Sequence, residues 1–109
     1  MWTISDNSHE RNVSIMAIHG AIGSSLAQAD EIEPGIWWVA RVKVHNDHQR
    51  KGLGRELVRR MTDACANRKA REVRVCPGGY NIPEEQQRAF YAACGFMADD
   101  DTGVMIWSP

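Results

Sequence analysis

The chain has 109 residues, of which 43 % are hydrophobic and 25 % are charged, the composition of an ordinary globular protein that forms one domain over residues 1–109. Thirteen basic and 14 acidic side chains leave a formal net charge of -1, so no overall basic field draws the chain to nucleic acid or to an anionic membrane. No stretch reaches the ~20 apolar residues of a membrane helix. The polar start of the chain does not read as a signal peptide. Three widely spaced cysteines without a CxxC pair argue against a disulfide framework or a metal site and favour a reducing cytoplasm.

The first half of the chain predicts three strands. Residues 12–19 are β-branched and apolar, and Gly20 separates them from a second strand over 21–28, which is the pattern of a hairpin. Residues 28–35 contain three acids, a proline and a glycine, and they are expected to form a loop. Residues 36–45 (IWWVARVKVH) are rich in Trp and Val and end in strict alternation, so they predict the clearest strand.

A helix is predicted after a polar turn over residues 46–51. From Leu53 to Cys65, apolar residues recur at steps of three and four, while arginines and acids occupy the opposite face. A short alternating strand over 72–76 follows and ends at a Pro-Gly-Gly sequence. The unit from the strand at 36 to the strand at 76 should therefore be a right-handed parallel crossover.

A second helix is predicted to begin at Pro83, which suits a first helical position, and to end at Gly95, which suits a C-terminal cap. Strands over 96–98 and 103–107 close the chain around an acidic turn. The order β-β-β-α-β-α-β-β predicts an α/β fold with a mixed sheet. The apolar stripe of the second helix is expected to consist of Ile82, Ala89, Phe90, Ala93 and Cys94.

The junction between the long strand and the first helix, residues 44–55 (VHNDHQRKGLGR), is the segment most able to carry chemistry. Gly52 and Gly54 allow a ligand to approach the backbone closely, and the unpaired amides of a helix N-terminus attract anions. Arg50, Lys51 and Arg55 add positive charge, which together suits a phosphate. The nucleotide P-loop and the dinucleotide fingerprint do not fit the spacing. On the residues alone, a glycine-containing helix start with solvated arginines is an equal alternative.

Two motifs in the right order identify a resemblance. Residues 49–54 (QRKGLG) fit the pattern Q/R-x-x-G-x-G/A of the GNAT superfamily of acyl-CoA-dependent N-acetyltransferases. Residues 90–96 (FYAACGF) are similar to the (L/F)-Y-x-x-x-G-F sequence that ends the next helix in that superfamily. The two matching segments, taken with the short strand between them, cover roughly residues 36–97. The resemblance implies a GNAT-like fold and an enzyme that moves an acetyl group from acetyl-CoA to a primary amine, without a metal.

The resemblance also implies a cofactor-binding set. In the superfamily, the loop amides and the helix N-terminus bind the pyrophosphate of acetyl-CoA, and the preceding strand binds the pantetheine arm between two strands that splay apart. An asparagine before the second helix is often a further contact, although here its spacing is unusual and a turn residue is an equal alternative. The implied residues are Val42, Lys43, Val44, Gln49, Arg50, Lys51, Gly52, Leu53, Gly54, Arg55 and Asn81.

Tyr91 matches the tyrosine that, in the superfamily, often protonates the departing CoA thiolate. A phenol beside the sulfur can donate that proton. The tyrosine lies off the expected apolar stripe of its helix, so it is not required for the core. The alternative is a helix-edge tyrosine that packs against the closing strands.

The general base cannot be carried over from the superfamily, because Trp37 and Trp38 stand where some members have a glutamate. The remaining candidates are Glu31, Glu33, His45 and His48, or deprotonation of the amine through water, which we favour. A covalent acyl-cysteine scheme on Cys76 or Cys94 is discounted, because no paired histidine is evident.

The alternative to an enzyme is a non-catalytic acyl-CoA-binding or protein-interaction module on the same fold. Superfamily members usually carry helices between their first two strands that wall the acceptor site, and this chain has only about eleven residues before its first confident strand. We therefore expect either an open groove for a large acceptor, such as a protein lysine or N-terminus, or a homodimer. In the homodimer, a second subunit supplies the wall and buries Trp37, Trp38 or Trp107.

Overall fold

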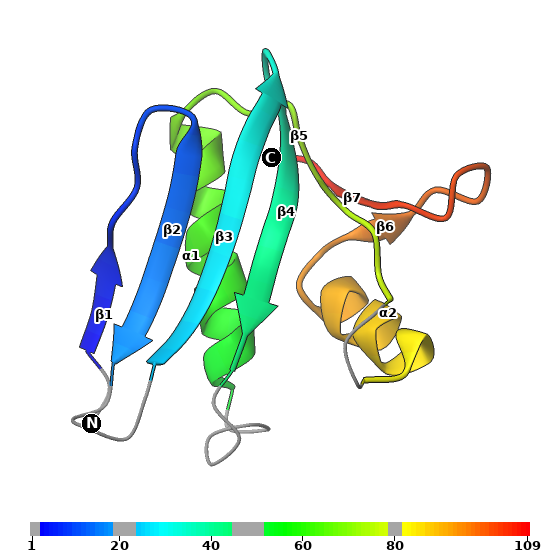
Figure 1. Ribbon diagram of the computed structural model, residues 1–109. Coiled ribbons are helices and arrows are strands. Elements are labelled where there is room, and N and C mark those ends of the chain that lie inside the picture. The colour runs from blue at the N-terminus through cyan, green and yellow to red at the C-terminus, as the bar shows by residue number, and fades with distance from the viewer. Residues whose placement is uncertain (1–2, 19–23, 45–51, 79–81) are drawn as a thin grey trace.

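The computed structural model describes residues 3–18, 24–44, 52–78 and 82–109, and within these residues seven strands form one sheet with two helices (Figure 1). The strand order in the sheet is β1-β2-β3-β4-β5-β7-β6. All described strand pairs are antiparallel except β4 and β5, which pair in parallel. The elements are β1 (Thr3–Asp6), β2 (Asn12–Ile18), β3 (Ser24–Glu33), β4 (Ile36–Lys43), α1 (Leu53–Asn67), β5 (Glu72–Val75), α2 (Glu84–Ala93), β6 (Met97–Ala98) and β7 (Met105–Trp107).

The predicted order of elements and the mixed sheet are confirmed from residue 12 onward, including the parallel pair at 36–38 and 72–74 that flanks α1 in the chain. The structure adds β1, whose polar sequence TISD gives no strand signal and which forms because it pairs with β2. The hairpin of β2 and β3 is antiparallel as expected, and the predicted turn at Gly20 lies outside the described residues.

The loop expected over residues 28–35 is wrong, because β3 continues to Glu33. At the start of this acidic segment, Asp30 lies opposite both Asn12 of β2 and Trp38 of β4, and beyond it Glu31 and Glu33 pair with β4 alone. Pairing with β4 satisfies backbone groups of the segment whatever its local propensity. The turn that the Pro-Gly pair predicts is real but shorter, and it occupies only residues 34–35.

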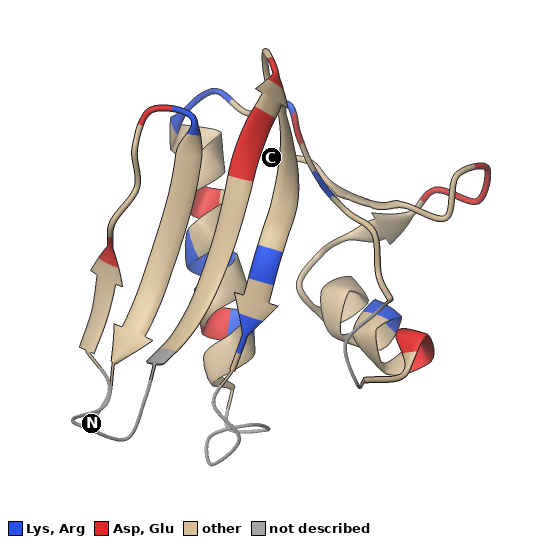
Figure 2. Cartoon of the chain, in the orientation of Figure 1, with Lys and Arg blue, Asp and Glu red and all other residues tan. Residues whose placement is uncertain are grey.

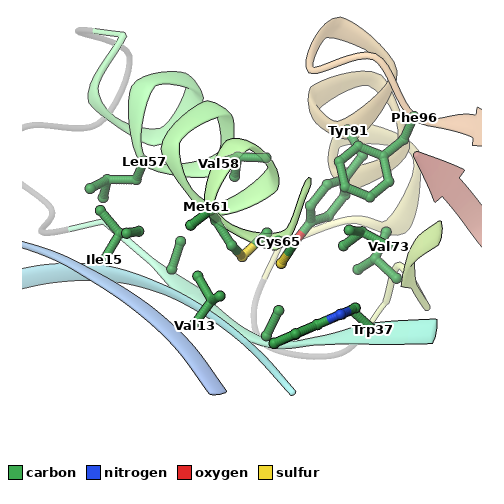
Figure 3. Packing of buried hydrophobic residues seen from close by; sticks show 14 of the residues in the cluster. Val13, Ile15, Trp37, Leu57, Val58, Met61, Cys65, Val73, Tyr91 and Phe96 are labelled. Carbon is green, nitrogen blue, oxygen red and sulfur yellow. The ribbon is translucent and has the colours of Figure 1, made fainter. Parts of the chain in front are cut away.

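The helical stripe predicted for residues 53–65 is confirmed, and it forms the core with the inward side chains of β2, β3, β4 and β5 (Figure 3). Figure 3 shows α1 and α2 on the same side of the strands, with Tyr91 between α2 and the sheet. Trp37 is fully buried in this core. It is therefore not available to a subunit interface, and the expectation that Trp37 is buried between chains is wrong.

The stripe predicted for α2 is wrong in part: Phe90 and Cys94 pack against the core, and the other three members do not. Tyr91 is the one residue of α2 that is buried, whereas Ala89 and Ala93 are exposed and Ile82 is 44 % exposed. The helix lies over the short strands at one end of the sheet, and there the rings of Tyr91 and Phe96 fill the interface at a centroid distance of 5.3 Å. The helix begins one residue later than predicted, because Pro83 has an extended ψ of 140° and is the N-cap.

Candidate functional site

The parallel pair β4 and β5 separates after three residue pairs. The last pair is Trp38 with Arg74; beyond it, β4 continues for five residues and, among the described strands, pairs with β3 alone. A β-bulge lies at this point, because Gln28 pairs with Arg41 and Ala29 pairs with Val39, which leaves Ala40 as an extra residue. Bulges bend and twist the strand that carries them. The bulge thus accounts for the divergence of β4 from β5.

A cavity of about 570 Å³ occupies the gap between the diverging strands. Its walls come from β4, from the start of α1, from the end of β5 and from α2. The lining residues are Val39, Ala40, Arg41, Val42, Val44, Gly52, Gly54, Arg55, Val75, Cys76, Gly78, Ile82, Gln86, Gln87, Phe90 and Tyr91.

The first turn of α1 forms one end of this cavity. Gly52 is the N-cap and has a φ of 80°, a left-handed conformation that favours glycine, and no side chain caps the helix. The first helical hydrogen bond runs from the Glu56 N–H to the Gly52 carbonyl at 3.1 Å, so helix geometry leaves the amides of Leu53, Gly54 and Arg55 without a partner inside the helix. These amides and the positive end of the helix dipole suit an anion.

The predicted binding residues divide into three groups. Val42, Val44, Gly52, Gly54 and Arg55 come together around the cavity. Lys43 is exposed and Leu53 is buried in the core, and neither lines the cavity. The remaining members of the predicted set lie outside the described residues; they are Gln49, Arg50, Lys51 and Asn81.

Tyr91 lines the cavity and is also part of the core. Only 7 % of its surface is exposed, and its ring makes edge contacts with Phe90 at 5.2 Å and with Phe96 at 5.3 Å between centroids. Two aromatic neighbours therefore fix the orientation of the ring. Tyr91 can therefore pack in the core and border the cavity at the same time.

The two acidic candidates for the general base do not line the cavity. The Glu31 carboxylate accepts a hydrogen bond from the Gly35 N–H at 3.0 Å and pairs with Arg11 at 3.3 Å. The Gly35 amide and Arg11 lower the pKa of Glu31, so this carboxylate is a weak base. Glu33 is exposed at the end of β3. The other candidates, His45 and His48, lie outside the described residues.

Two further residues of the site, Gln87 and Phe90, were missing from the predicted set, although Phe90 is the first residue of the motif over 90–96. Gln87 joins both sides of the cavity rim: its Oε1 accepts from the Gly78 N–H at 3.1 Å, and its Nε2 donates to the Ile82 carbonyl at 3.1 Å. Phe90 packs against the start of α1, where it meets Gly54. The polar Gln-Gln pair on the exposed side of α2 was the available sign that this face borders a site.

The cysteines near the cavity differ in burial. Burial raises the pKa of the Cys94 thiol, although Arg55 opposes the shift, so Cys94 is a poor nucleophile near neutral pH. Cys76 is exposed and lines the cavity.

No helix in the described part of the chain has the length and apolar character needed to cross a bilayer.

Solved structures of other proteins share this architecture. A Bacillus subtilis acetyltransferase in complex with CoA is 14 % identical with a TM-score of 0.78, and the match covers 100 % of this chain and 99 % of that one. The IAA acetyltransferase of Bacillus cereus is 17 % identical with a TM-score of 0.73 and coverage of 92 % and 79 %. The ribosomal-protein-S18-alanine N-acetyltransferase of Escherichia coli is 19 % identical with a TM-score of 0.70 and coverage of 94 % and 72 %.

At these identities the structural matches establish the fold alone. No curated protein matches the sequence. Residues 8–98, however, match the family described as the acetyltransferase (GNAT) domain. The match includes both motifs, the diverging strands and the whole described lining of the cavity. The chain therefore belongs to the GNAT family of acyl-CoA N-acyltransferases.

Proposed function

We propose that the chain transfers an acetyl group from acetyl-CoA to a primary amine, and that the cavity between β4 and β5 binds the acetyl-CoA. The observation that supports this most directly is the position of the cavity. It runs from the unpaired amides of α1 to the point where Trp38 and Arg74 form the last pair between β4 and β5. A phosphate group fits the α1 end, and in this proposal the thioester lies towards the end beside the last β4–β5 pair.

The strand edge between these ends suits an amide-rich chain. From Val39 to Lys43, β4 pairs with β3 but not with β5, so the backbone groups directed at the gap have no partner in the described sheet. An extended ligand with amide groups can add to such an edge by backbone hydrogen bonds. The side chains of Val39, Val42 and Val44 provide an apolar wall beside it. This arrangement suits the pantetheine arm of CoA.

The chemical step in this proposal is direct attack. The neutral amine nitrogen bonds to the thioester carbon, negative charge develops on the carbonyl oxygen, and the carbon–sulfur bond then breaks. The Tyr91 hydroxyl donates its proton to the departing thiolate, and amides of β4 stabilise the oxyanion. In this proposal the proton released by the attacking amine leaves through water; neither Glu31 nor Glu33 lines the cavity, and His45 and His48 are the alternative bases.

The acceptor in this proposal is an amine on a small molecule, a protein lysine or a protein N-terminus. The related Escherichia coli enzyme is named for an alanine of a ribosomal protein, which is an acceptor of the third kind. The three described cysteines are free, which fits a reducing compartment such as the cytoplasm.

Isothermal titration calorimetry with acetyl-CoA tests the site, and release of free CoA thiol over a panel of amines, polyamines, aminoglycosides and peptides tests the reaction. We expect binding and amine-dependent thiol release. Binding without release for any acceptor class would instead support a non-catalytic acyl-CoA-binding module. Absence of binding would contradict both functions. The Gly54→Val variant is the matched negative control, because its side chain would collide with Phe90 and Val44 at the cavity wall.

A further inference from the structure

The side chains of β4 alternate between the two faces of the sheet beyond the point where β5 separates from it. Val42 and Val44 pack on the helix side, where Val44 Cγ2 would stand 3.2 Å from a Cβ added to Gly54 at the start of α1. Because successive residues of a strand point to opposite faces, Arg41 and Lys43 point to the face that neither α1 nor α2 covers (Figures 1 and 3). Figure 2 shows this half of β4 with basic residues and no acidic residue.

The cavity wall contains groups from both faces of the sheet. The first turn of α1 and Arg55 contribute to it from the helix side, and Arg41 borders it from the opposite face. Lys43, which points to the same face as Arg41, does not line the cavity. In the proposed function, acetyl-CoA occupies the α1 side of the gap, because its phosphates meet the unpaired helix amides there. The Arg41 side is then left for the acceptor.

The charged groups of the cavity wall all have one sign. Among the described lining residues, Arg41 and Arg55 are charged and no carboxylate is present. Neither arginine forms a salt bridge within the part of the chain that the structure describes. By contrast, the Glu84 carboxylate, which lies near Gly78 at the rim, pairs with Arg88 at 3.0 Å. The wall therefore attracts an anionic group and repels a cationic one.

We propose that the acceptor is a primary amine whose molecule also carries a carboxylate, and that Arg41 binds this carboxylate while the amine attacks the thioester. The proposal rests on the proposed acyl transfer, because it names the acceptor class of that reaction. A guanidinium binds a carboxylate through two parallel N–H···O bonds, which orient the acceptor as well as attract it. Arg41 is a specificity residue in this arrangement and takes no part in the chemical step.

The position of Arg41 along β4 limits the distance between the two groups of the acceptor. Arg41 lies three residues beyond Trp38, the last β4 residue that pairs with β5 and the place of the proposed thioester. Three residues of a strand span about 10 Å, so the carboxylate must lie within about 10 Å of the amine. A free amino acid meets this limit, as does a peptide with an acidic side chain next to its N-terminus. Polyamines and aminoglycosides carry further cations and are disfavoured.

Initial rates of CoA thiol release with matched acceptors test the proposal. One series compares ω-amino acids with their amides and with the diamines of the same length. A second compares tripeptides with glutamate, glutamine or lysine after the first residue. In the series that reacts, we expect kcat/KM for the acid to exceed that for the additional amine by about 10-fold, with the amide between them. Arg41→Glu should reverse the order, and Arg41→Gln should abolish it.

The two series distinguish the source of the carboxylate. Reaction of the amino acids alone identifies a small acceptor, and reaction of the peptides alone identifies a protein N-terminus; both results support the proposal if the acid is preferred. Lys43→Gln is the matched control, because it removes a cation from the same strand and the same face without changing the cavity wall. This variant should keep the preference for the acid.

Calorimetry separates binding of the acceptor from binding of acetyl-CoA. The affinity of Arg41→Gln for acetyl-CoA should stay within about 3-fold of that of the unmodified chain at physiological salt, where screening weakens the interaction across the sheet. A larger loss would assign Arg41 to the cofactor and overturn the proposal.

The kinetic outcomes distinguish this proposal from the acyl transfer on which it rests. Thiol release without a preference for the acid would overturn the proposal and leave acyl transfer standing. So would a preference that Arg41→Glu retains while circular dichroism shows a folded variant. If Arg41→Glu fails to fold, loss or retention of the preference in Arg41→Gln decides. No thiol release with any amine would contradict the proposed function and, with it, the anionic acceptor.

Discussion

The Phe90 ring lies against the backbone of Gly54: a Cβ added to Gly54 would stand 3.2 Å from Phe90 Cε1 and 3.2 Å from Val44 Cγ2. One glycine thus allows α2, the first turn of α1 and the end of β4 to meet at the cavity wall. A methyl group at this position has to displace an aromatic ring and a β-branched side chain, and both are stiffer than the end of a long side chain.

Gly54→Ala should therefore reduce the free energy of unfolding by about 1 kcal/mol, although alanine is the better helix former by about 0.5–1 kcal/mol. Urea unfolding of a double-mutant cycle with Phe90→Leu checks the cause. When Phe90→Leu is already present, the same alanine should be nearly neutral or stabilising, with a coupling energy of about 1 kcal/mol. Additive effects of the two changes would show that contact with Phe90 is not what requires glycine.

Gly52 requires glycine for a different reason. An added Cβ there would meet nothing within 4 Å, but the φ of 80° is strained for any residue with a side chain. Gly52→Ala should cost about 1 kcal/mol of stability through the backbone alone. Gly52→Asn should cost less, because asparagine tolerates the left-handed conformation. Equal losses for the two variants in thermal unfolding would argue against this explanation.

Tyr91→Phe separates packing from proton donation. The ring contacts with Phe90 and Phe96 are retained, so the free energy of unfolding should change by about 1 kcal/mol or less. If the hydroxyl protonates the thiolate, kcat should fall by about 10²-fold with little change in the affinity for acetyl-CoA. Steady-state kinetics with calorimetry measure both quantities. Phe96→Leu is the packing control: it should lower stability and leave the pH dependence of kcat unchanged.

Cys65 should make the fold sensitive to alkali. Burial raises the pKa of its thiol from 9.0 to about 12. Above pH 9 the unfolded chain loses this proton while the folded chain keeps it, so stability falls as the pH rises, by about 1.4 kcal/mol for each pH unit up to about 12. Urea unfolding of the unmodified chain and of Cys65→Ala between pH 8 and about pH 10 should show a shallower decline in the variant. Parallel declines would contradict the assignment to Cys65.

The sequence predicted best those helices and strands whose structure follows from the spacing of their own residues. The three- and four-residue spacing in α1 predicts the buried face, because a long amphipathic helix buries the same stripe whichever sheet it meets. The alternation in β4 likewise predicts a strand. For α2 the pattern succeeded only in part: Phe90 packs against the core as predicted, whereas Ala89 and Ala93 are exposed, and the sheet beneath the helix selects Tyr91 as the buried residue.

The amino-acid sequence by itself determined the order of elements from β2 onward, the glycine-containing start of α1 and the two motifs that resemble the GNAT superfamily, because these depend on neighbours along the chain. The tertiary structure alone decided the extension of β3 through an acidic segment, the divergence of β4 from β5 after Trp38 and the cavity that results. These features depend on which strand pairs with which. Backbone pairing across strands is set by residues distant in the sequence, and no local pattern records it.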